Sequence, residues 1–526
     1  MNVVGIDLGT SMSVIARLDP TGAPVTIANS LGDPRTPSVV YYDDKNRKAV
    51  VGQTAKRRAP NEPERVAAFV KREIGSKTYS RTVDGRTFRP ETLSAIILRK
   101  LKQDAERKIG PISKVVITVP AYFDHGRRMA TQDAGRIAGL EVVDIINEPT
   151  AAALSYAALQ AQHAEGTCKQ LLDVPGGQMT ALVYDLGGGT FDVTLVDLRA
   201  RRFRTLATDG EAELGGKDWD ERITAYLVGQ FVQQFGFDPT QTDARLREKL
   251  QGLAEDAKIQ LSDFDQAELE VGHAQQVLRR VLTRDEFEHM SAGLLESTRM
   301  TTENLIDKAE LGWEKIDRIL LVGGATKMPM VKKLLGTMSG KVPDDSLDAD
   351  QVVAQGAAVY SGICAAKDDD CELMLPESVI EELRQIEPII HRNAHSLGVA
   401  AYYGDVKKNF HLIPKNTELP AAMSQVFYTH RSGRASLHVQ VLEGEAEEPE
   451  HNIQVGECRI TGLPPELPQG SPVQVRLAYD GSGRITVMAL DMTYGRFAQA
   501  VIENHNRLTK EQIEREKQFV DSLEIQ

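Results

Sequence analysis

The spacing of hydrophobic residues divides the chain into two main regions. Up to about residue 366, short apolar runs such as 114–119, 182–195 and 319–322 alternate with stretches of helical spacing, which predicts a mixed α/β region. Beyond residue 396, apolar side chains recur at every second position, and glycine-rich turns separate the runs. Because alternation with a period of two turns one face of a strand toward a core, this part predicts a β-rich domain built from hairpins.

The segment between these regions and the end of the chain have patterns of their own. Residues 367–395 begin with a polar, acidic stretch and continue with apolar residues at helical spacing, which predicts a linker that contains one short helix. The final stretch opens with a capping-box pair, Thr509 and Gln512, so we expect one short helix there. The predicted divisions of the chain are 1–366, 367–395, 396–507 and 508–526.

Length and composition favour several domains. The chain has 526 residues, whereas a single core rarely grows beyond ~250–300 residues. Its formal net charge of −13 argues against a protein that coats nucleic acid, since phosphate backbones demand clustered Lys and Arg. The four cysteines lack C-x-x-C spacing, the N-terminal residues lack a basic leader, and no run of ~18 apolar residues occurs. We therefore expect reduced thiols, a cytoplasmic location and no membrane span.

An acid followed by a glycine-rich turn occurs twice and carries the clearest chemistry. Asp7 and Asp185 each end an apolar run, and a second apolar run follows each turn, which predicts two hairpins that face each other across a cleft. Backbone N–H groups of such turns can approach phosphate oxygens, and the two carboxylates can hold Mg²⁺ through its waters. The repeated pattern therefore predicts a clamp for a metal-bound nucleotide. A third glycine turn, at Gly323 and Gly324, brings further backbone close to the ligand.

Four ordered motifs resemble a known family. Residues 5–10, 147–153, 185–192 and 322–326 are similar to the signatures of the seventy-kilodalton heat-shock chaperones, within the actin-like ATPase superfamily. The resemblance spans the whole α/β region and continues, more weakly, through the β-rich domain. It implies an α/β actin-like ATPase domain of two lobes with ATP between them, followed by a β-sandwich that binds peptides.

The resemblance implies catalytic roles for four residues. Lys71 matches the lysine beside the γ-phosphate, and Glu148 matches an acid that binds the metal's water or orients the attacking one. Asp192 and Thr190 match groups near that water. Phosphoryl transfer to water requires positioning and positive charge near the transferring oxygens, which suits this set. Without the resemblance, Lys71 is typical of a solvated lysine on an amphipathic helix, and Glu148 of an acid at a helix N-terminus.

The resemblance also implies which residues surround the nucleotide. Glu255, Lys258 and Ser262 fall three and four positions apart, so they share one helix face, which in the family holds the ribose and base. Asp7 and Asp185 are expected to reach the metal through water. The residues expected to contact the nucleotide are Gly9, Thr10, Ser11, Gly187, Gly188, Gly189, Gly215, Gly216, Glu255, Lys258, Ser262, Gly323, Gly324, Lys327 and Asp350.

Three departures from the family pattern concern the base. Ala325 stands where a serine is usual, and Ile259 and Lys327 replace arginines that stack on or flank the base. A lysine cannot reproduce the stacking of a planar guanidinium. We therefore expect weaker nucleotide affinity or base selectivity than is usual in the family, with the phosphate chemistry retained.

In the β-rich domain the resemblance implies a groove for an extended peptide. Val399, Phe427 and Leu437 match positions of an apolar pocket for a Leu-like side chain, while main-chain hydrogen bonds would supply affinity. Taken alone, such alternating apolar residues are more typical of a core. Tyr402 stands where methionine is common, and His430 where a small residue forms part of an arch over the peptide. These two bulkier side chains predict an altered peptide preference.

Four further features concern communication within the chain. Pro120 and Arg128 match the family's relay from nucleotide to peptide domain, although a proline after a strand is also a common strand terminator. Residues 388–391 replace the family's leucine-rich linker, which leaves open whether the two domains are coupled. The short final helix replaces a long helical lid, so we expect a bound peptide to leave quickly. Residues 160–177 form an insertion that predicts an extra surface contact.

The interpretation that best fits the sequence is an ATP-dependent chaperone. We expect an ATPase that slowly hydrolyses ATP to ADP and phosphate, with Mg²⁺ bound, and that holds unfolded peptides of client proteins. A J-domain co-chaperone and a nucleotide exchange factor would be its partners, and neither nucleic acid nor membrane is expected. Two alternatives stay open: a nucleotide-switched scaffold with little turnover, and a small-molecule kinase of the same superfamily.

Overall fold

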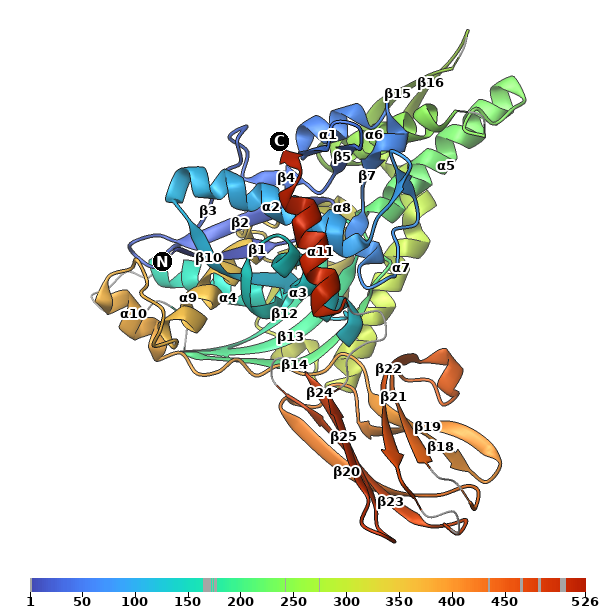
Figure 1. Ribbon diagram of the computed structural model, residues 1–526. Helices are drawn as coiled ribbons and strands as arrows, with labels where there is room; N and C mark the ends of the chain where they lie inside the picture. The colour runs from blue at the N-terminus through green and yellow to red at the C-terminus, as the bar shows by residue number, and fades with distance from the viewer. Residues whose placement is uncertain are drawn as a thin grey trace.

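The computed structural model contains two lobes built on separate sheets, with a β-sandwich attached to them (Figure 1). The described residues are 2–163, 172, 174, 177–241, 243–273, 275–433, 436–463, 467–480, 484–501 and 508–526. Most of the predicted insertion at 160–177 lies outside them, as do residues 481–483. None of the helices in the described ranges is long and apolar enough to cross a membrane.

Lobe I contains a mixed sheet in the order β11-β10-β1-β2-β3, with β4 beside β2. Its elements are β1 (Asn2–Asp7), β2 (Met12–Leu18), β3 (Pro24–Thr26), β4 (Arg35–Pro37), β10 (Ile112–Val119), β11 (Glu141–Asn147), α2 (Pro90–Ile109) and α3 (His125–Ile137). β1 is parallel to β10 and antiparallel to β2, so Asp7 stands where the chain leaves the sheet for the β1–β2 turn. The alternation of β1 directs Val4 and Ile6 toward the core formed with α2.

A smaller sheet extends lobe I. Its strands run in the order β26-β6-β5-β7, and β26 comes from the end of the chain. The elements of this part are β5 (Val40–Asp43), β6 (Lys48–Val51), α1 (Gln53–Arg58), β7 (Val66–Ala67), β8 (Thr82–Val83), β9 (Arg86–Thr87) and β26 (Glu524–Ile525). Lys71 follows β7 on a short 3₁₀ turn, Val70–Glu73, and not on the amphipathic helix that the sequence suggested.

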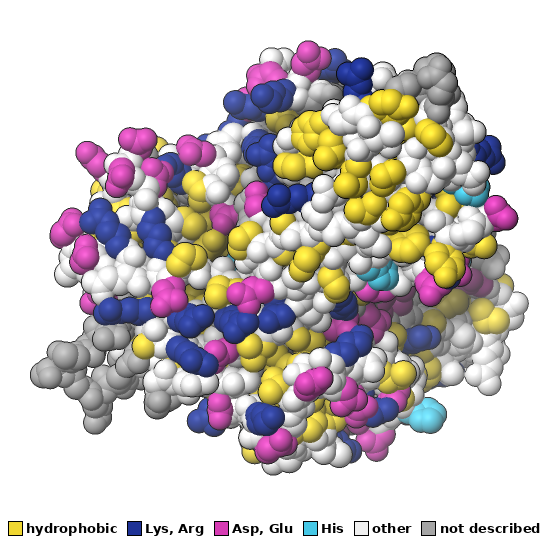
Figure 2. All heavy atoms as spheres, turned by 90° about the horizontal axis from the view of Figure 1, so that it is seen from below, with side chains coloured by type: hydrophobic (Ala, Val, Ile, Leu, Met, Phe, Trp, Pro, Cys, Tyr) yellow, Lys and Arg dark blue, Asp and Glu magenta, His cyan; other side chains and the backbone are white. Residues whose placement is uncertain are grey.

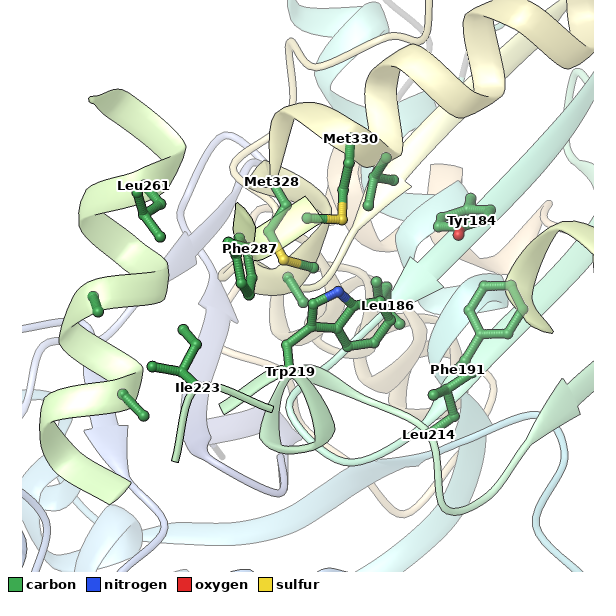
Figure 3. Packing of buried hydrophobic residues seen from close by; sticks show 14 of the residues in the cluster. Tyr184, Leu186, Phe191, Leu214, Trp219, Ile223, Leu261, Phe287, Met328 and Met330 are labelled. Atoms are coloured by element: carbon green, nitrogen blue, oxygen red, sulfur yellow. The ribbon is translucent and has the colours of Figure 1, made fainter. Parts of the chain in front are cut away.

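Lobe II contains a second sheet in the order β14-β13-β12-β17, with helices and a projecting hairpin. Its elements are β12 (Gln178–Leu186), β13 (Phe191–Arg199), β14 (Arg202–Glu211), α5 (Gly216–Phe235), α6 (Ala244–Asp263), β15 (Gln266–His273), β16 (Gln276–Thr283), α7 (Arg284–Lys308), β17 (Arg318–Val322) and α8 (Pro329–Ser339). The fully buried Trp219 packs with Leu186, Phe287 and Met328 in the core of this lobe (Figure 3).

Two helices pack between the two sheets. They are α4 (Glu148–His163) and α9 (Val352–Ala366). Their buried faces share one hydrophobic cluster with residues of both lobes, such as Val116 from lobe I and Val183 from lobe II. β1 approaches α9 so closely that a Cβ at Gly5 would lie 2.1 Å from the backbone nitrogen of Ala358. The lobes are therefore joined through α4 and α9.

The linker region contains the short helix α10 (Glu377–Arg384), followed by an extended stretch. Ile380 and Leu383 of this helix, together with Ile386 just after it, are buried in the same hydrophobic cluster as α9. Ile390 then runs beside the edge strand β14: its carbonyl accepts from the Thr205 amide at 2.9 Å, and its amide donates to the Phe203 carbonyl at 3.1 Å. The linker is therefore fixed to lobe II.

The β-rich domain is a sandwich of two four-stranded antiparallel sheets. Its strands are β18 (Leu397–Tyr403), β19 (Val406–Ile413), β20 (Ala421–Tyr428), β21 (Ser436–Glu443), β22 (Ile453–Thr461), β23 (Pro472–Tyr479), β24 (Ile485–Asp491) and β25 (Phe497–Val501). Inward residues such as Val441, Val475 and Val487 fill one core, as the period-two pattern predicts. Figure 2 shows hydrophobic side chains gathered on the face of the molecule seen from below. In the sandwich, Tyr428 and Phe497 are among the large hydrophobic residues that are exposed.

The final residues return to lobe I. The predicted capping box is present, because the Thr509 side chain accepts from the Gln512 amide and begins α11 (Lys510–Asp521). Figure 1 shows α11, in red, lying against the blue elements of lobe I. The sequence predicted only this helix, but β26 follows it and pairs in parallel with β6. A strand of two residues carries no periodic pattern, which explains why it was not foreseen.

Candidate functional site

The two acid-and-glycine turns meet face to face between the lobes. A Cβ at Gly188 would lie 2.1 Å from Oγ of Ser11, and one at Gly189 would lie 2.5 Å from the Thr10 side chain. Such distances are far below van der Waals contact, so any larger residue would push the turns apart. The repeated pattern predicted facing hairpins, and the structure places them in contact.

A cleft of about 590 Å³ opens beside these turns. Most of the predicted nucleotide residues line it, but Gly189, Gly215 and Asp192 do not. Gly215 instead supports the second turn, since a Cβ there would lie 2.5 Å from the backbone nitrogen of Gly189. The predicted residues in the lining are Asp7, Gly9, Thr10, Ser11, Lys71, Glu148, Asp185, Gly187, Gly188, Thr190, Gly216, Glu255, Lys258, Ser262, Gly323, Gly324, Lys327 and Asp350.

The predicted catalytic residues lie at the floor of the cleft. Lys71 is only 5% exposed and forms a buried ion pair with Glu148, which begins α4 directly after β11. Thr118 donates from Oγ1 to Oδ1 of Asp7 at 2.9 Å. Asp192 lies behind the lining, where its Oδ1 accepts from the Tyr122 amide at 2.9 Å.

The charge at this floor is strongly unbalanced. Burial, followed by the charge of Glu148, raises the pKa of Asp7 to about 7, while Lys71 lowers it. The same two causes raise the pKa of Asp192 to about 7, and burial also raises the pKa of Asp185 well above its ordinary value. Four carboxyl groups thus share one buried ammonium, an arrangement that a divalent cation would neutralise.

Polar residues line the opposite end of the cleft, and an ion pair there connects the two lobes. Lys56 of α1 forms a 2.6 Å ion pair with Glu255 of α6, which connects lobe I to lobe II. Lys258, one turn along α6, pairs with Asp220 of α5 at 2.7 Å. Ile259 also lines this end and is 56% exposed. The predicted helix face therefore points into the cleft, with an apolar side chain beside it.

Sequence reasoning missed several residues that hold the cleft together. Arg72 donates from Nε to the Gly189 carbonyl at 3.1 Å and pairs with Asp218 at the start of α5. Arg35 approaches Asp350 at 3.4 Å, and Lys327 pairs with the same carboxylate. These contacts join residues distant in sequence. The only local signal was the position of Arg72 beside Lys71.

The sandwich contacts the two lobes through a polar junction. Asn416 accepts from the Thr208 amide at 3.0 Å, and Lys415 forms a 2.7 Å ion pair with Asp209 of β14. Arg204 of the same strand pairs with Glu418. On lobe I, the amide of His125, the first residue of α3, donates to Glu443 at 3.0 Å. Both lobes therefore contact the sandwich.

Arg128, one of the two predicted relay residues, lies at this junction. Its Nη2 donates to Oδ1 of Asn147 at 2.6 Å, and it borders a small cavity with His391, Glu443 and Tyr479. Burial, followed by the charge of Asp124, raises the pKa of Glu443 to about 8. Pro120 directly follows β10, and its carbonyl accepts from the Phe123 amide at 3.2 Å. Among the described residues, Pro120 forms no hydrogen bond to the sandwich.

A more direct route to the sandwich passes through Tyr122, which the sequence did not single out. Its amide donates to Asp192, and its carbonyl contacts Nε2 of His395 at 3.0 Å. The two rings also meet edge to face, with centroids 4.3 Å apart. His395 lies just before β18. One residue of lobe I thus links the acid behind the cleft to the base of the sandwich.

All five predicted peptide-binding residues line one cavity in the sandwich, of about 390 Å³. Val399, Phe427 and Leu437 supply apolar walls. Tyr402 of β18 and His430, which follows β20, stack with centroids 4.2 Å apart and an interplanar angle of 11°. His430 also lies 3.9 Å from the Asp405 carboxylate. The stacked pair therefore joins β18 of one sheet to the segment that follows β20 of the other.

A two-lobed cleft that fits a nucleotide, joined to a sandwich with its own apolar cavity, defines the class of nucleotide-driven peptide-binding chaperones. The chain belongs to the Hsp70 family, whose model, described as Hsp70 protein, matches residues 3–524. It is similar to the chaperone protein dnaK3 of Thermosynechococcus vestitus, with 38% identity over 543 aligned positions that cover 97% of this chain and 74% of the relative. The predicted fold class is confirmed, and the chain is an ATP-hydrolysing chaperone of this family. The kinase and scaffold alternatives are not favoured.

Proposed function

We propose that the chain binds Mg-ATP between the lobes, hydrolyses it with the help of Lys71, and uses the nucleotide state to control how tightly the sandwich holds an extended peptide. The observation that carries this proposal is the meeting of the two glycine turns above the buried Lys71–Glu148 pair. That arrangement presents backbone N–H groups, an ammonium and carboxylates to one small volume. Phosphoryl transfer needs this combination of donors and charge.

The residues present fit a magnesium ion held through water. Asp7 and Asp185 stand at the ends of β1 and β12, on opposite sides of the cleft, and their carboxylate oxygens are ligands that Mg²⁺ prefers. Among the described residues, no group of three or more His, Cys, Asp or Glu side chains gathers closely enough to hold a metal directly. When bound, the ion would neutralise charge on the phosphate oxygens.

The protein side chains then have separate tasks. Lys71 would place positive charge beside the transferring phosphoryl group, and Glu148 holds that ammonium in position. Thr190 and the turn amides would orient phosphate oxygens. Asp192 would stand near the attacking water, while its bond to Tyr122 connects it to His395. Movement of Asp192 during the reaction would therefore reach the sandwich over two contacts.

The peptide cavity supports a preference for one bulky apolar side chain. Val399, Phe427 and Leu437 offer the walls, and β-strand backbone groups near the cavity would bind the peptide main chain. The Tyr402–His430 stack would have to open for entry. We propose that it slows release of a bound peptide.

The proposed partners follow from this cycle. Unfolded client proteins would supply the peptides, a J-domain protein would stimulate hydrolysis, and an exchange factor would release ADP. We also propose a cytoplasmic location, which is supported by free thiols at Cys364, Cys371 and Cys458.

The test measures phosphate release by the purified chain with and without an unfolded apolar peptide. We expect slow release that the peptide accelerates. Lys71→Met should retain ATP binding in calorimetry and reduce turnover by ~100-fold or more, since it removes charge from the transition state. The control Lys77→Met alters an exposed lysine nearby and should behave like the unmodified chain. ATP binding without any turnover, or full activity of Lys71→Met, would contradict the proposal.

A further inference from the structure

The C-terminal segment, residues 508–526, forms part of the hydrophobic core of lobe I. Leu508, Val520, Leu523 and Ile525 are at most 9% exposed, and they share one cluster with β1, β5 and α2. Phe519 packs at the edge of this cluster, with its ring centroid 6.0 Å from that of Phe88. Apolar residues near both ends of the segment are therefore buried in the lobe, while its outer face stays exposed.

Polar contacts fix the direction of this segment. Asp521 forms an ion pair with Arg99, and Glu516 accepts from the Thr92 hydroxyl at 2.7 Å, so α11 is anchored to α2 at two points. The guanidinium of Arg86 stands 3.9 Å above the Phe519 ring. These contacts specify one docked position.

Main-chain pairing completes the attachment. The Gln526 amide donates to the Ala49 carbonyl at 2.9 Å, and the Val51 amide donates to the Gln526 carbonyl at 2.9 Å. The Glu524 amide donates to the Arg47 carbonyl at 3.1 Å. β26 thereby covers the edge of β6, whose backbone groups would otherwise face solvent.

The sandwich is consequently attached at both of its ends. Its N-terminal end follows Ile390, which is bonded to β14 of lobe II, and its C-terminal end leads from residue 501 to residue 508 on lobe I. The chain between 501 and 508 spans at most about 25 Å when fully extended, at ~3.3–3.6 Å per residue. The two attachments lie on different lobes, so the sandwich bridges them.

We propose that residues 508–526 are a permanent second tether that stays docked on lobe I in every nucleotide state. The sandwich then moves only within the short reach of this tether and does not separate from the ATPase lobes. The tether keeps the sandwich at a high effective concentration beside the lobes. Any contacts that break at the junction therefore re-form quickly. Docking of residues 508–526 does not require ATP turnover.

The first experiment cuts the connection between the sandwich and the tether without changing the length of the chain. A protease recognition sequence replaces residues 502–507 in the full chain, and the cut and uncut forms are compared by gel filtration with and without Mg-ATP. We expect the fragment 508–526 to co-elute with the body in both conditions. Release of the fragment in native buffer, with or without nucleotide, would overturn the proposal.

Small-angle X-ray scattering of the same samples tests the restraint. Without nucleotide, we expect the maximum dimension of the cut form to exceed that of the uncut form, because the linker becomes the one covalent connection to the sandwich and the contacts of the polar junction can then open further. Equal dimensions would show that the tether restrains nothing, and the inference would fail. Both readouts are independent of hydrolysis, so a chain with no ATPase activity could still support the tether.

A pair of variants separates docking from folding. Val520→Asp places a carboxylate in the core contact and should release the fragment after cutting, whereas Arg515→Asp makes a charge change on the exposed side of α11 and should retain it. Calorimetry with Mg-ATP verifies that lobe I remains folded in both variants. Retention of the Val520→Asp fragment would contradict the assigned docking.

Discussion

In the cleft between the lobes, four carboxyl groups and one ammonium are buried beside glycine turns that touch each other. The cavity of the sandwich has apolar walls from Val399, Phe427 and Leu437, and the Tyr402–His430 stack also lines it. The inner part of the cleft therefore has little freedom to change, because Lys71 is paired with Glu148 and the facing turns leave no room for a Cβ at Gly188 or Gly189. The cavity can accept different side chains at moderate cost. The difference suggests that catalysis is fixed by geometry while peptide preference is adjustable.

The largest effect should come from crowding the cleft. Gly189→Ala places a methyl group where Thr10 lies within 2.5 Å, so the two turns must separate. A displacement of about 1 Å at reacting groups can cost ~100-fold in rate, and we expect at least that loss of ATP turnover in a steady-state assay.

The matched control for this substitution is Gly229→Ala in α5. A Cβ there meets nothing within 4 Å, so turnover should be unchanged and the helix slightly more stable. Equal activity of Gly189→Ala and Gly229→Ala would mean that the meeting turns do not set the geometry of catalysis.

Glu91 is a buried carboxyl that lies outside both sites. It can show how much the burial of a charge lowers the stability of the fold when no ligand offsets it. Glu91 of α2 is 2% exposed, and Oε2 has no hydrogen-bond partner among the described residues. Burial raises its pKa from 4.5 to about 7, with Asp133 of α3 and Glu516 of α11 adding to the rise and Arg89 opposing it. The native state thus favours the neutral carboxyl, and its stability falls as pH rises from about 5 to 8.

Glu91→Gln removes this titration. We expect the variant to be more stable than the unmodified chain by about 2 kcal/mol at pH 8 and nearly equal to it at pH 5, as measured by urea unfolding. An identical pH dependence of the two proteins would show that Glu91 does not carry the cost of burial.

The smallest effect is expected at the opening of the peptide cavity. His430→Ala removes the ring that stacks on Tyr402, and aromatic pairs contribute ~0.5–1.5 kcal/mol, so a fluorescent apolar peptide should leave roughly two- to tenfold faster. His451→Ala, an exposed histidine outside the cavity, serves as the control. Slower release from His430→Ala would indicate that the stack obstructs the peptide and does not retain it.

The cleft was largely predictable because its signals are local. An acid, a glycine turn and the strands around them lie within about ten residues, and the physics of phosphate binding restricts which residues fit. The peptide cavity required the family resemblance, since alternating apolar residues equally describe a core. Val399 and Leu437 illustrate this, because they belong to the wall of the cavity and pack at the sandwich core.

The remaining features depend on contacts between distant parts of the chain. The Lys56–Glu255 pair and the Tyr122–His395 contact join residues that no local pattern connects. The docked tail is similar: its helix was foreseen from a capping box, but its position depends on an apolar surface formed by α2 and β6. Lys71 was placed on a helix by its neighbours, whereas burial beside Glu148 holds it on a 3₁₀ turn.

The most direct test of the account measures peptide release from the intact chain. A fluorescent apolar peptide is bound without nucleotide, and its dissociation is followed by stopped flow after Mg-ATP is added. The account predicts faster dissociation with Mg-ATP than with buffer, because the cleft and the sandwich are joined through the junction. An identical dissociation rate in the two cases would contradict the claim that nucleotide in the cleft controls the sandwich.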